Sequence, residues 1–256
     1  CIVSMRRLVR PPTSAEWFLT LQIPSRARCC SNGSLAPWDS NEAAYDHIAE
    51  RFAAHRRHPW DYVTEWLQNA PKEERELLVA GCGAGRNIKA AVQLGLHTQI
   101  RGVDISQGML GAAGKSLRDV LGHRVQLTRG NVCDMPFEAQ SQDAVLACAV
   151  LHHLPLHLAN AALAEFSRVL RPGGRLLVSC WDPCAATLKQ RGRHAGGSAD
   201  FWLTWRVPGG QDAERWFNLP TLEQRQQHWD SFPSLQLQHS GRIGNSQVFK
   251  WLRQPN

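Results

Sequence analysis

This chain has 256 residues, 43% of them hydrophobic, with 29 lysines and arginines against 22 acidic residues. That length and apolar content suit one large α/β domain or two small ones, and they exclude a mainly disordered chain. No uninterrupted apolar run approaches the ~18 residues of a membrane-spanning helix, so we expect no membrane segment. The eight scattered cysteines lack a paired CxxC spacing, which favours a reducing compartment over a secreted disulfide scaffold.

The positive charge is concentrated at the start of the chain. Residues 1–38 hold +4 of the net charge of +7, and they are rich in arginine and serine but poor in acidic residues. This composition is typical of a transit peptide, so we expect a leader over 1–38 and a mitochondrial or other organelle location. The alternatives are a disordered tail or translated upstream sequence, which would leave a cytoplasmic protein.

The folded body is expected to span residues 39–256. Hydrophobic periodicity predicts a helix over 43–53 and a second over 60–69, which Pro59 opens. Short apolar runs then alternate with helical patterns. The predicted strands cover 76–80, 100–103, 125–128, 144–150 and 175–181, and the predicted helices cover 87–94, 109–121 and 158–170. Near-continuous apolar strands that alternate with helices predict a parallel sheet covered on both faces.

Two later segments break this alternation. Residues 182–232 carry glycine pairs and a group of aromatic residues, and we expect a loop-rich insertion there on the substrate side. Residues 235–240 and 247–252 flank a glycine-containing turn and predict an antiparallel hairpin. The fold class that follows is α/β, a doubly wound and mainly parallel seven-stranded sheet that ends in this C-terminal antiparallel hairpin.

A glycine-rich turn follows the first predicted strand. Gly81, Gly83 and Gly85 have the spacing G-x-G-x-G, which allows a tight turn and lets a ligand lie against the backbone. The helix that begins there favours a negatively charged group at its N-terminus. Asp104 ends the next predicted strand, where a carboxylate can accept hydrogen bonds from both ribose hydroxyls of an adenosine. Together these features predict a nucleoside cofactor, although Asp104 alone could be a helix N-cap.

Several motifs in chain order resemble those of class I S-adenosylmethionine-dependent methyltransferases. They are GCGAG at 81–85, VDIS at 103–106, MPF at 135–137, VLHHL at 150–154 and RVLRPGG at 168–174. The resemblance implies a Rossmann-like fold and S-adenosyl-L-methionine as cofactor. The residues implied to contact it are Gly81, Cys82, Gly83, Gly85, Asp104, Ile105, Asn131, Val132 and Ala149.

The resemblance also implies a role for each part of this set. The glycine loop would cradle the methionine part of the cofactor, Asp104 would hold the ribose, and Ile105 would pack on the adenine. Family members usually carry an acidic residue where this chain has Asn131, and often one before the glycine loop, where it has Ala80. These departures leave open a catalytically silent binding subunit with a methyltransferase fold.

Further segments resemble the tRNA methyltransferases that esterify 5-carboxymethyluridine at the wobble position. They are residues 45–52, 55–60, 149–153, 179–181, 200–205, 215–219 and 244–245. This subgroup implies tRNA as substrate and a small zinc-binding activator protein as partner. The alternative is a small-molecule methyltransferase acting on a quinone or similar acceptor, a class that shares the central motifs but not the 45–60 segment.

The chemistry of ester formation suggests candidate catalytic residues. A carboxylate with a pKa of about 4 is ionised at neutral pH and needs no general base, so the enzyme has to position it in a water-poor site. Cations and hydrogen-bond donors can orient it, and an arginine fork matches its geometry. The candidates are Arg56, Arg57, His152, His153 and Arg215, of which Arg56, His152, His153 and Arg215 are preferred. Solvated arginines and near-core histidines are the alternatives.

A metal site is not expected. Cys180 and Cys184 with His194 have an irregular spacing for zinc, and a fourth ligand is missing.

Overall fold

The computed structural model describes residues 36–230 and 232–255. The predicted leader over 1–38 lies outside the described residues except for its last three positions, so its targeting role stays a prediction. Within the described ranges, no helix is both long enough and apolar enough to cross a membrane.

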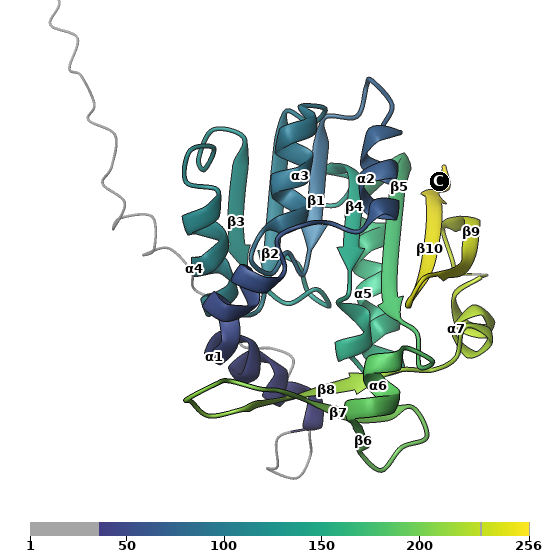
Figure 1. The fold of residues 1–256 in the computed structure, drawn as a ribbon. Coiled ribbons are helices and arrows are strands. Elements are labelled where there is room, and N and C mark those ends of the chain that lie inside the picture. The colour runs from purple at the N-terminus through teal and green to yellow at the C-terminus, as the bar shows by residue number, and fades with distance from the viewer. Residues whose placement is uncertain (1–35, 231, 256) are drawn as a thin grey trace, which may run out of the picture.

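The centre of the molecule is a seven-stranded sheet in the order β3-β2-β1-β4-β5-β10-β9 (Figure 1). Its strands are β1 (Glu76–Ala80), β2 (Gln99–Asp104), β3 (Val125–Arg129), β4 (Gln142–Cys148), β5 (Leu170–Trp181), β9 (Leu235–Ile243) and β10 (Ser246–Arg253). Strands β1 to β5 pair in parallel, and β10 runs antiparallel to both of its neighbours. The mainly parallel sheet with a C-terminal hairpin is therefore confirmed.

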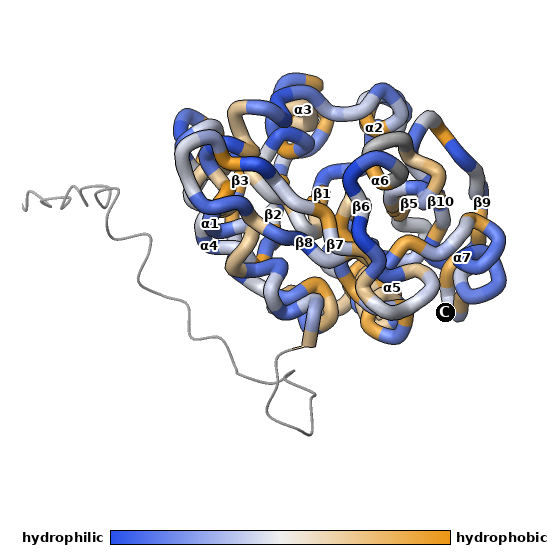
Figure 2. Tube along the Cα trace, turned by 60° about the horizontal axis from the view of Figure 1, so that its bottom comes forward, coloured by the Kyte–Doolittle hydropathy of each residue, from blue (hydrophilic) through white to orange (hydrophobic). Residues whose placement is uncertain are grey.

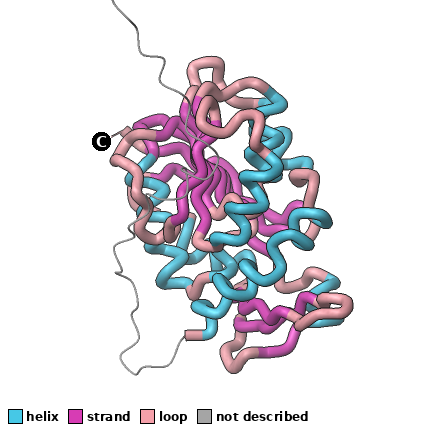
Figure 3. The backbone as a smooth tube through the Cα atoms, turned by 90° about the vertical axis from the view of Figure 1, so that its left-hand side faces the viewer, coloured by secondary structure: helices cyan, strands magenta, loops and turns pink. Residues whose placement is uncertain are grey.

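Helices cover both faces of this sheet (Figures 1 and 3). One face carries α2 (Asp61–Gln68), α3 (Arg86–Leu94) and α4 (Gln107–Ser116), and the other carries α5 (Leu156–Val169) and α7 (Leu222–Trp229). In β1, Leu77 and Val79 pack in the first layer and Leu78 and Ala80 in the second, as the alternation of an extended strand requires. Burial on both faces explains why the strands are apolar throughout.

One helix end differs clearly from the sequence expectation, and the end of a second helix lies within one residue of it. The helix α4 stops at Ser116 instead of continuing to 121, and Gly111 and Gly114 weaken its C-terminal half. Helix α5 passes directly into β5, which contains the Pro172-Gly173-Gly174 turn as an irregularity in its pairing with β4. Pro172 therefore lies within the strand.

Residues 182–232 are not loop-rich, and that expectation was wrong. They form α6 (Ala186–Arg191) and a second, three-stranded antiparallel sheet of β6 (Gly192–His194), β7 (Asp200–Trp205) and β8 (Ala213–Asn218), followed by α7. The glycine pairs lie in the turns that connect these strands. Large side chains on both faces of β7 and β8 hid the alternation of apolar and polar residues that identifies a strand.

The small sheet and α1 (Ser40–His55) lie together across the carboxyl end of the parallel strands (Figures 1 and 2). The Asn41 amide donates to the carbonyl of Trp216 at 2.9 Å and accepts from its N–H at 2.7 Å, which pairs the backbone of this residue on the free edge of β8. Asp46 Oδ1 accepts from the Gly108 N–H at 2.7 Å, at the start of α4. A Cβ on Gly108 would meet the Asp46 backbone oxygen at 2.8 Å, so glycine permits this close approach. Helix α1 thus joins the two sheets.

Candidate active site

The loop after β1 has an open side. Gly81, Gly83 and Gly85 adopt positive φ angles of 61°, 53° and 83°. A Cβ on Gly81 would meet the Val150 side chain at 2.2 Å, whereas a Cβ on Gly83 would have nothing within 4 Å. Gly81 is therefore required by packing, while the backbone at Gly83 faces free space that a ligand can occupy.

Asp104 lies beside this open backbone at the end of β2. Its Oδ2 accepts from the Gly83 N–H at 2.7 Å, and its Oδ1 accepts from the Ser106 N–H at 3.0 Å. Burial raises the pKa of Asp104 to about 6, although both N–H groups act to lower it. The N-cap of α4 is Ser106, which accepts from Met109 N–H. Ile105, next to Asp104, is 44% exposed.

The other predicted cofactor residues lie on neighbouring turns. Asn131 Oδ1 accepts from the Cys133 N–H at 2.9 Å, so this side chain caps its own turn. Val132 is 8% exposed and packs into the core. Ala149 follows β4 with a φ of 60°, and its N–H donates to the Ser179 carbonyl at 2.9 Å.

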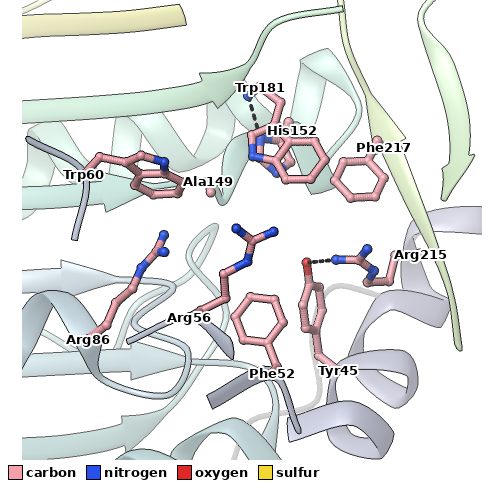
Figure 4. A pocket seen from close by; sticks show the side chains of 10 residues that line it. All are labelled: Tyr45, Phe52, Arg56, Trp60, Arg86, Ala149, His152, Trp181, Arg215 and Phe217. Atoms are coloured by element: carbon pink, nitrogen blue, oxygen red, sulfur yellow. Dashed lines mark hydrogen bonds between the residues drawn. The ribbon is translucent and has the colours of Figure 1, made fainter. Parts of the chain in front are cut away.

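A pocket opens between α1, the start of α3, the ends of β4 and β5, and β8 (Figure 4). Its lining residues are Tyr45, Phe52, Arg56, Trp60, Arg86, Ala149, His152, Trp181, Arg215 and Phe217. Four of the residues singled out from the sequence, Arg56, Ala149, His152 and Arg215, are thus brought together. His153 does not line the pocket but lies directly behind it.

Arg215 is the most unusual of these residues because its side chain is buried without a counterion. It is 4% exposed, and its Cζ lies 5.3 to 5.7 Å from the ring centres of Tyr45, Trp205 and Phe217. Its hydrogen-bond partner is the Tyr45 hydroxyl at 3.4 Å, and its Nε has no partner. No carboxylate in the described part of the chain pairs with it. A buried cation of this kind is costly unless a ligand supplies the negative charge.

Sequence reasoning missed Arg86, the second arginine on the pocket wall. It opens α3 directly after the glycine loop, and its Cζ lies 3.8 Å from the centre of the Trp60 ring. Burial lowers the pKa of Arg86, and the nearby Arg56 adds to this effect. The helix dipole disfavours a cation at this position, so an arginine directly after the glycine loop is the sequence signal that could have found it.

The two neighbouring histidines are each held in one neutral form. The Trp181 N–H donates to His152 Nδ1 at 3.0 Å, so the proton of His152 is on Nε2. His153 Nδ1 donates to the Trp216 carbonyl at 3.0 Å, so its Nε2 accepts, and the donor there is the Tyr45 hydroxyl at 2.7 Å. Burial lowers the pKa of His152 well below its ordinary range and that of His153 to about 3.

Comparison with known proteins identifies the family. The model of a methyltransferase domain matches residues 78–178. A protein of Encephalitozoon cuniculi that is named as a methyltransferase candidate is 34% identical over 70% of this chain and 79% of its own length. This chain belongs to the class I S-adenosylmethionine-dependent methyltransferases.

Two further similarities are weaker, because one relative matches over a shorter part of its length and the other at a lower sequence identity. The tRNA (carboxymethyluridine(34)-5-O)-methyltransferase of Xenopus tropicalis is 34% identical over 54% of this chain, which spans only 20% of that protein. A chain from the complex between the Haloferax volcanii Trm112 methyltransferase activator and a methyltransferase superposes with a TM-score of 0.61 and 15% identity, covering 84% of this chain and 98% of that one. At that identity the likeness shows the fold alone.

S-adenosylmethionine is the cofactor of this family, and the residues present fit it. The free space over Gly83 suits a ligand that lies against the loop, and the half-buried Asp104 offers carboxylate oxygens next to the exposed Ile105. Among the described residues, no group of three or more histidine, cysteine or acidic side chains is placed to hold a metal ion.

Proposed function

We propose that this methyltransferase converts a carboxylate on a modified wobble uridine of tRNA into its methyl ester. One observation supports a carboxylate as the methyl acceptor: the side chains that line the pocket present hydrogen-bond donors. Arg56, Arg86 and Arg215 are cations, and all three line the pocket. His152 adds an Nε2 proton, because its Nδ1 already accepts from a backbone N–H. An ionised carboxylate only accepts hydrogen bonds, so it complements this set of donors.

The described residues that line the pocket include no carboxylate, and His152 can only donate from Nε2, so neither kind of side chain is available to remove a proton from an acceptor. A hydroxyl or a carbon acid would need a general base, whereas a carboxylate with a pKa of about 4 is already ionised. This supports ester formation over methylation of a quinone-type small molecule.

The walls of the pocket suit a planar base. The rings of Trp181 and Phe217 stack at 5.3 Å with an interplanar angle of 20°, and both line the pocket. Aromatic side chains of this kind can stack on a nucleobase. The Xenopus relative is named for its action on carboxymethyluridine at position 34, and this name supports the proposed substrate.

For the cofactor, we assign the methionine part to the glycine loop, with the close approach at Gly83. Asp104 would accept from the ribose hydroxyls, and Ile105 would cover the adenine, with Asn131 and Val132 at its edge. When bound, S-adenosylmethionine supplies an electrophilic methyl group. The contribution of the protein is to orient the acceptor carboxylate through Arg215 and His152 and to exclude water with the surrounding rings.

A small activator protein is proposed as a partner, because the Haloferax structure holds a methyltransferase of this fold together with the Trm112 activator. The assay should therefore be run with and without such a protein.

The test is a methylation assay with an anticodon stem-loop that carries 5-carboxymethyluridine. We expect S-adenosylmethionine to yield the methyl ester, identified by mass spectrometry of the nucleosides, and the stem-loop with unmodified uridine to yield nothing. The tRNA proposal fails if no ester forms with or without the activator. If calorimetry also detects no binding of S-adenosylmethionine, the chain is a silent subunit. If a quinol acceptor is methylated instead, the small-molecule alternative is correct.

A further inference from the structure

Arg215 is held at both ends by the same set of contacts. At its tip, the guanidinium donates to the Tyr45 hydroxyl. At its base, the carbonyl of the next residue, Trp216, accepts from His153 Nδ1 at 3.0 Å. The Tyr45 hydroxyl and His153 Nε2 lie 2.7 Å apart, and this contact closes the ring. The ring therefore connects α1, the segment after β4 and β8, which are far apart in the sequence.

The nearer of two contacts assigns the hydrogen-bond directions around this ring. The Trp216 carbonyl lies 3.0 Å from His153 Nδ1 and the Asn41 amide nitrogen 3.4 Å from it. The carbonyl can only accept, so His153 carries its proton on Nδ1 and accepts at Nε2. The single proton of the Tyr45 hydroxyl is then committed to His153. Burial, which lowers the pKa of His153 to about 3, keeps the imidazole from reversing this direction at neutral pH.

The consequence concerns the oxygen of Tyr45. Because its proton points to His153, this oxygen faces the pocket side as an acceptor, and the donor that reaches it is Arg215 at 3.4 Å. The contact is long, as site hydrogen bonds often are before a substrate binds. The aromatic rings around Arg215 give attraction without direction, so this oxygen sets the orientation of the guanidinium fork.

We propose that Tyr45 and His153 are positioning residues that orient Arg215 toward the acceptor carboxylate and so set the preference for a charged over a neutral acceptor. This inference rests on the proposed function. Neither residue needs to touch the reacting atoms. Tyr45 acts through its hydroxyl on Arg215, and His153 acts by taking the hydroxyl proton.

The chain provides a matched control for this proposal. It has two tyrosines, and the second, Tyr62, donates its buried hydroxyl to Ser179 at 3.1 Å without lining the pocket. Tyr62→Phe and Tyr45→Phe each remove one hydroxyl and retain the ring. A purely structural effect of a lost hydroxyl should therefore appear in both variants, whereas a positioning effect should appear only in Tyr45→Phe.

The experiment measures binding of two stem-loops in the presence of S-adenosylhomocysteine, so that no turnover occurs. One carries 5-carboxymethyluridine and the other its neutral amide. We expect Tyr45→Phe to weaken binding of the acid about tenfold and to leave binding of the amide unchanged. Tyr62→Phe should retain the full preference for the acid. The double variant Tyr45→Phe/Arg215→Met should prefer the acid no less than Arg215→Met alone, because Tyr45 acts through Arg215.

Two outcomes overturn the positioning role. One is a wild-type preference for the acid that Tyr45→Phe leaves intact, and the other is an equal loss of both ligands. A wild-type protein with no preference for the acid would instead defeat the carboxylate acceptor of the proposed function. Nitrogen-15 NMR provides a readout independent of any acceptor, since His153 should show the Nδ1–H form between pH 5 and 8 and the other form would contradict the ring.

Discussion

An arginine packs against aromatic rings at each end of the central sheet, but within the described part of the chain only one of the two guanidinium groups pairs with a carboxylate. At the amino end, Arg175 of β5 lies 4.2 Å from the centre of the Trp66 ring and donates to both carboxylate oxygens of Glu74, at 2.7 and 3.0 Å. At the carboxyl end, Arg215 lies among three rings and has one long hydrogen bond, to the Tyr45 hydroxyl. The first charge is balanced within the chain and the second is not.

Whether a buried arginine has a carboxylate partner helps to distinguish a structural role from a binding role. A buried charge whose partner belongs to the fold is a structural ion pair, and removing either member leaves the other unsatisfied. A buried charge without such a partner is a cost that the fold bears, and such costs concentrate at binding sites. We therefore expect the amino end to support stability and the carboxyl end to support ligand binding.

The largest expected effect on stability is at the amino end. Arg175→Met keeps an apolar stem over Trp66 but leaves Glu74, whose side chain is 3% exposed, without its arginine. We expect a loss of about 3–5 kcal/mol in the free energy of unfolding, measured by urea denaturation. Methyl transfer per folded molecule should stay close to that of the wild type. A variant as stable as the wild type would contradict the structural role of the Arg175–Glu74 ion pair.

The matched change at the carboxyl end should reduce activity and leave stability intact. Arg215→Met removes a buried cation that has no counterion, so the melting temperature should stay the same or rise. The kcat/KM for a carboxylate acceptor should fall roughly a hundredfold, because a charged hydrogen-bonding partner of the substrate is lost. Arg215→Lys should recover part of this loss. A fall in melting temperature as large as that of Arg175→Met would show that Arg215 is structural.

Much of the fold followed from the sequence because the parallel strands are buried on both faces. The apolar runs over β1 and β4 reflect that burial directly, and the glycine loop ended the first of them where expected. The small sheet of β6 to β8 could not be found in this way. Its strands carry large residues on both faces, so they lack the alternation that identifies a half-buried strand.

The sequence predicted only those parts of the site whose residues lie close together along the chain. The order of the glycine loop and Asp104 along the chain indicated a cofactor site, and both lie side by side in the structure. The unpaired state of Arg215 was not visible, since it depends on contacts with Tyr45, which is 170 positions away in the sequence. The same holds for His153, whose place behind the pocket depends on Tyr45 and Trp216.

A carboxylate at each end of the sheet has a shifted pKa, and the two shifts have opposite directions: the pKa of Asp104 is raised and that of Glu74 is lowered. Burial raises the pKa of Asp104 at the carboxyl end to about 6. If the ionised form holds the cofactor ribose, affinity for S-adenosylmethionine should be full above pH 7 and fall about tenfold by pH 5. Calorimetry across this range tests it. Asp104→Asn should bind weakly with a flat profile, and a wild-type profile that is equally flat would exclude Asp104 from the cofactor site.

Glu74 at the amino end should give the smaller pH effect, and its effect should appear at lower pH than that of Asp104. Burial acts to raise its pKa, but hydrogen bonds from His97 and Arg175 outweigh this and lower it below the ordinary 4.5. A lowered pKa contributes stability that is present above the unfolded value and is lost as pH falls through the folded one. The stability difference between wild type and Glu74→Gln should therefore shrink by about 1 kcal/mol between pH 7 and pH 3. Urea midpoints at both pH values measure it. A difference that does not change with pH would mean that the Glu74 carboxylate is not held ionised by its partners, and the contrast between the two ends would lose its electrostatic basis.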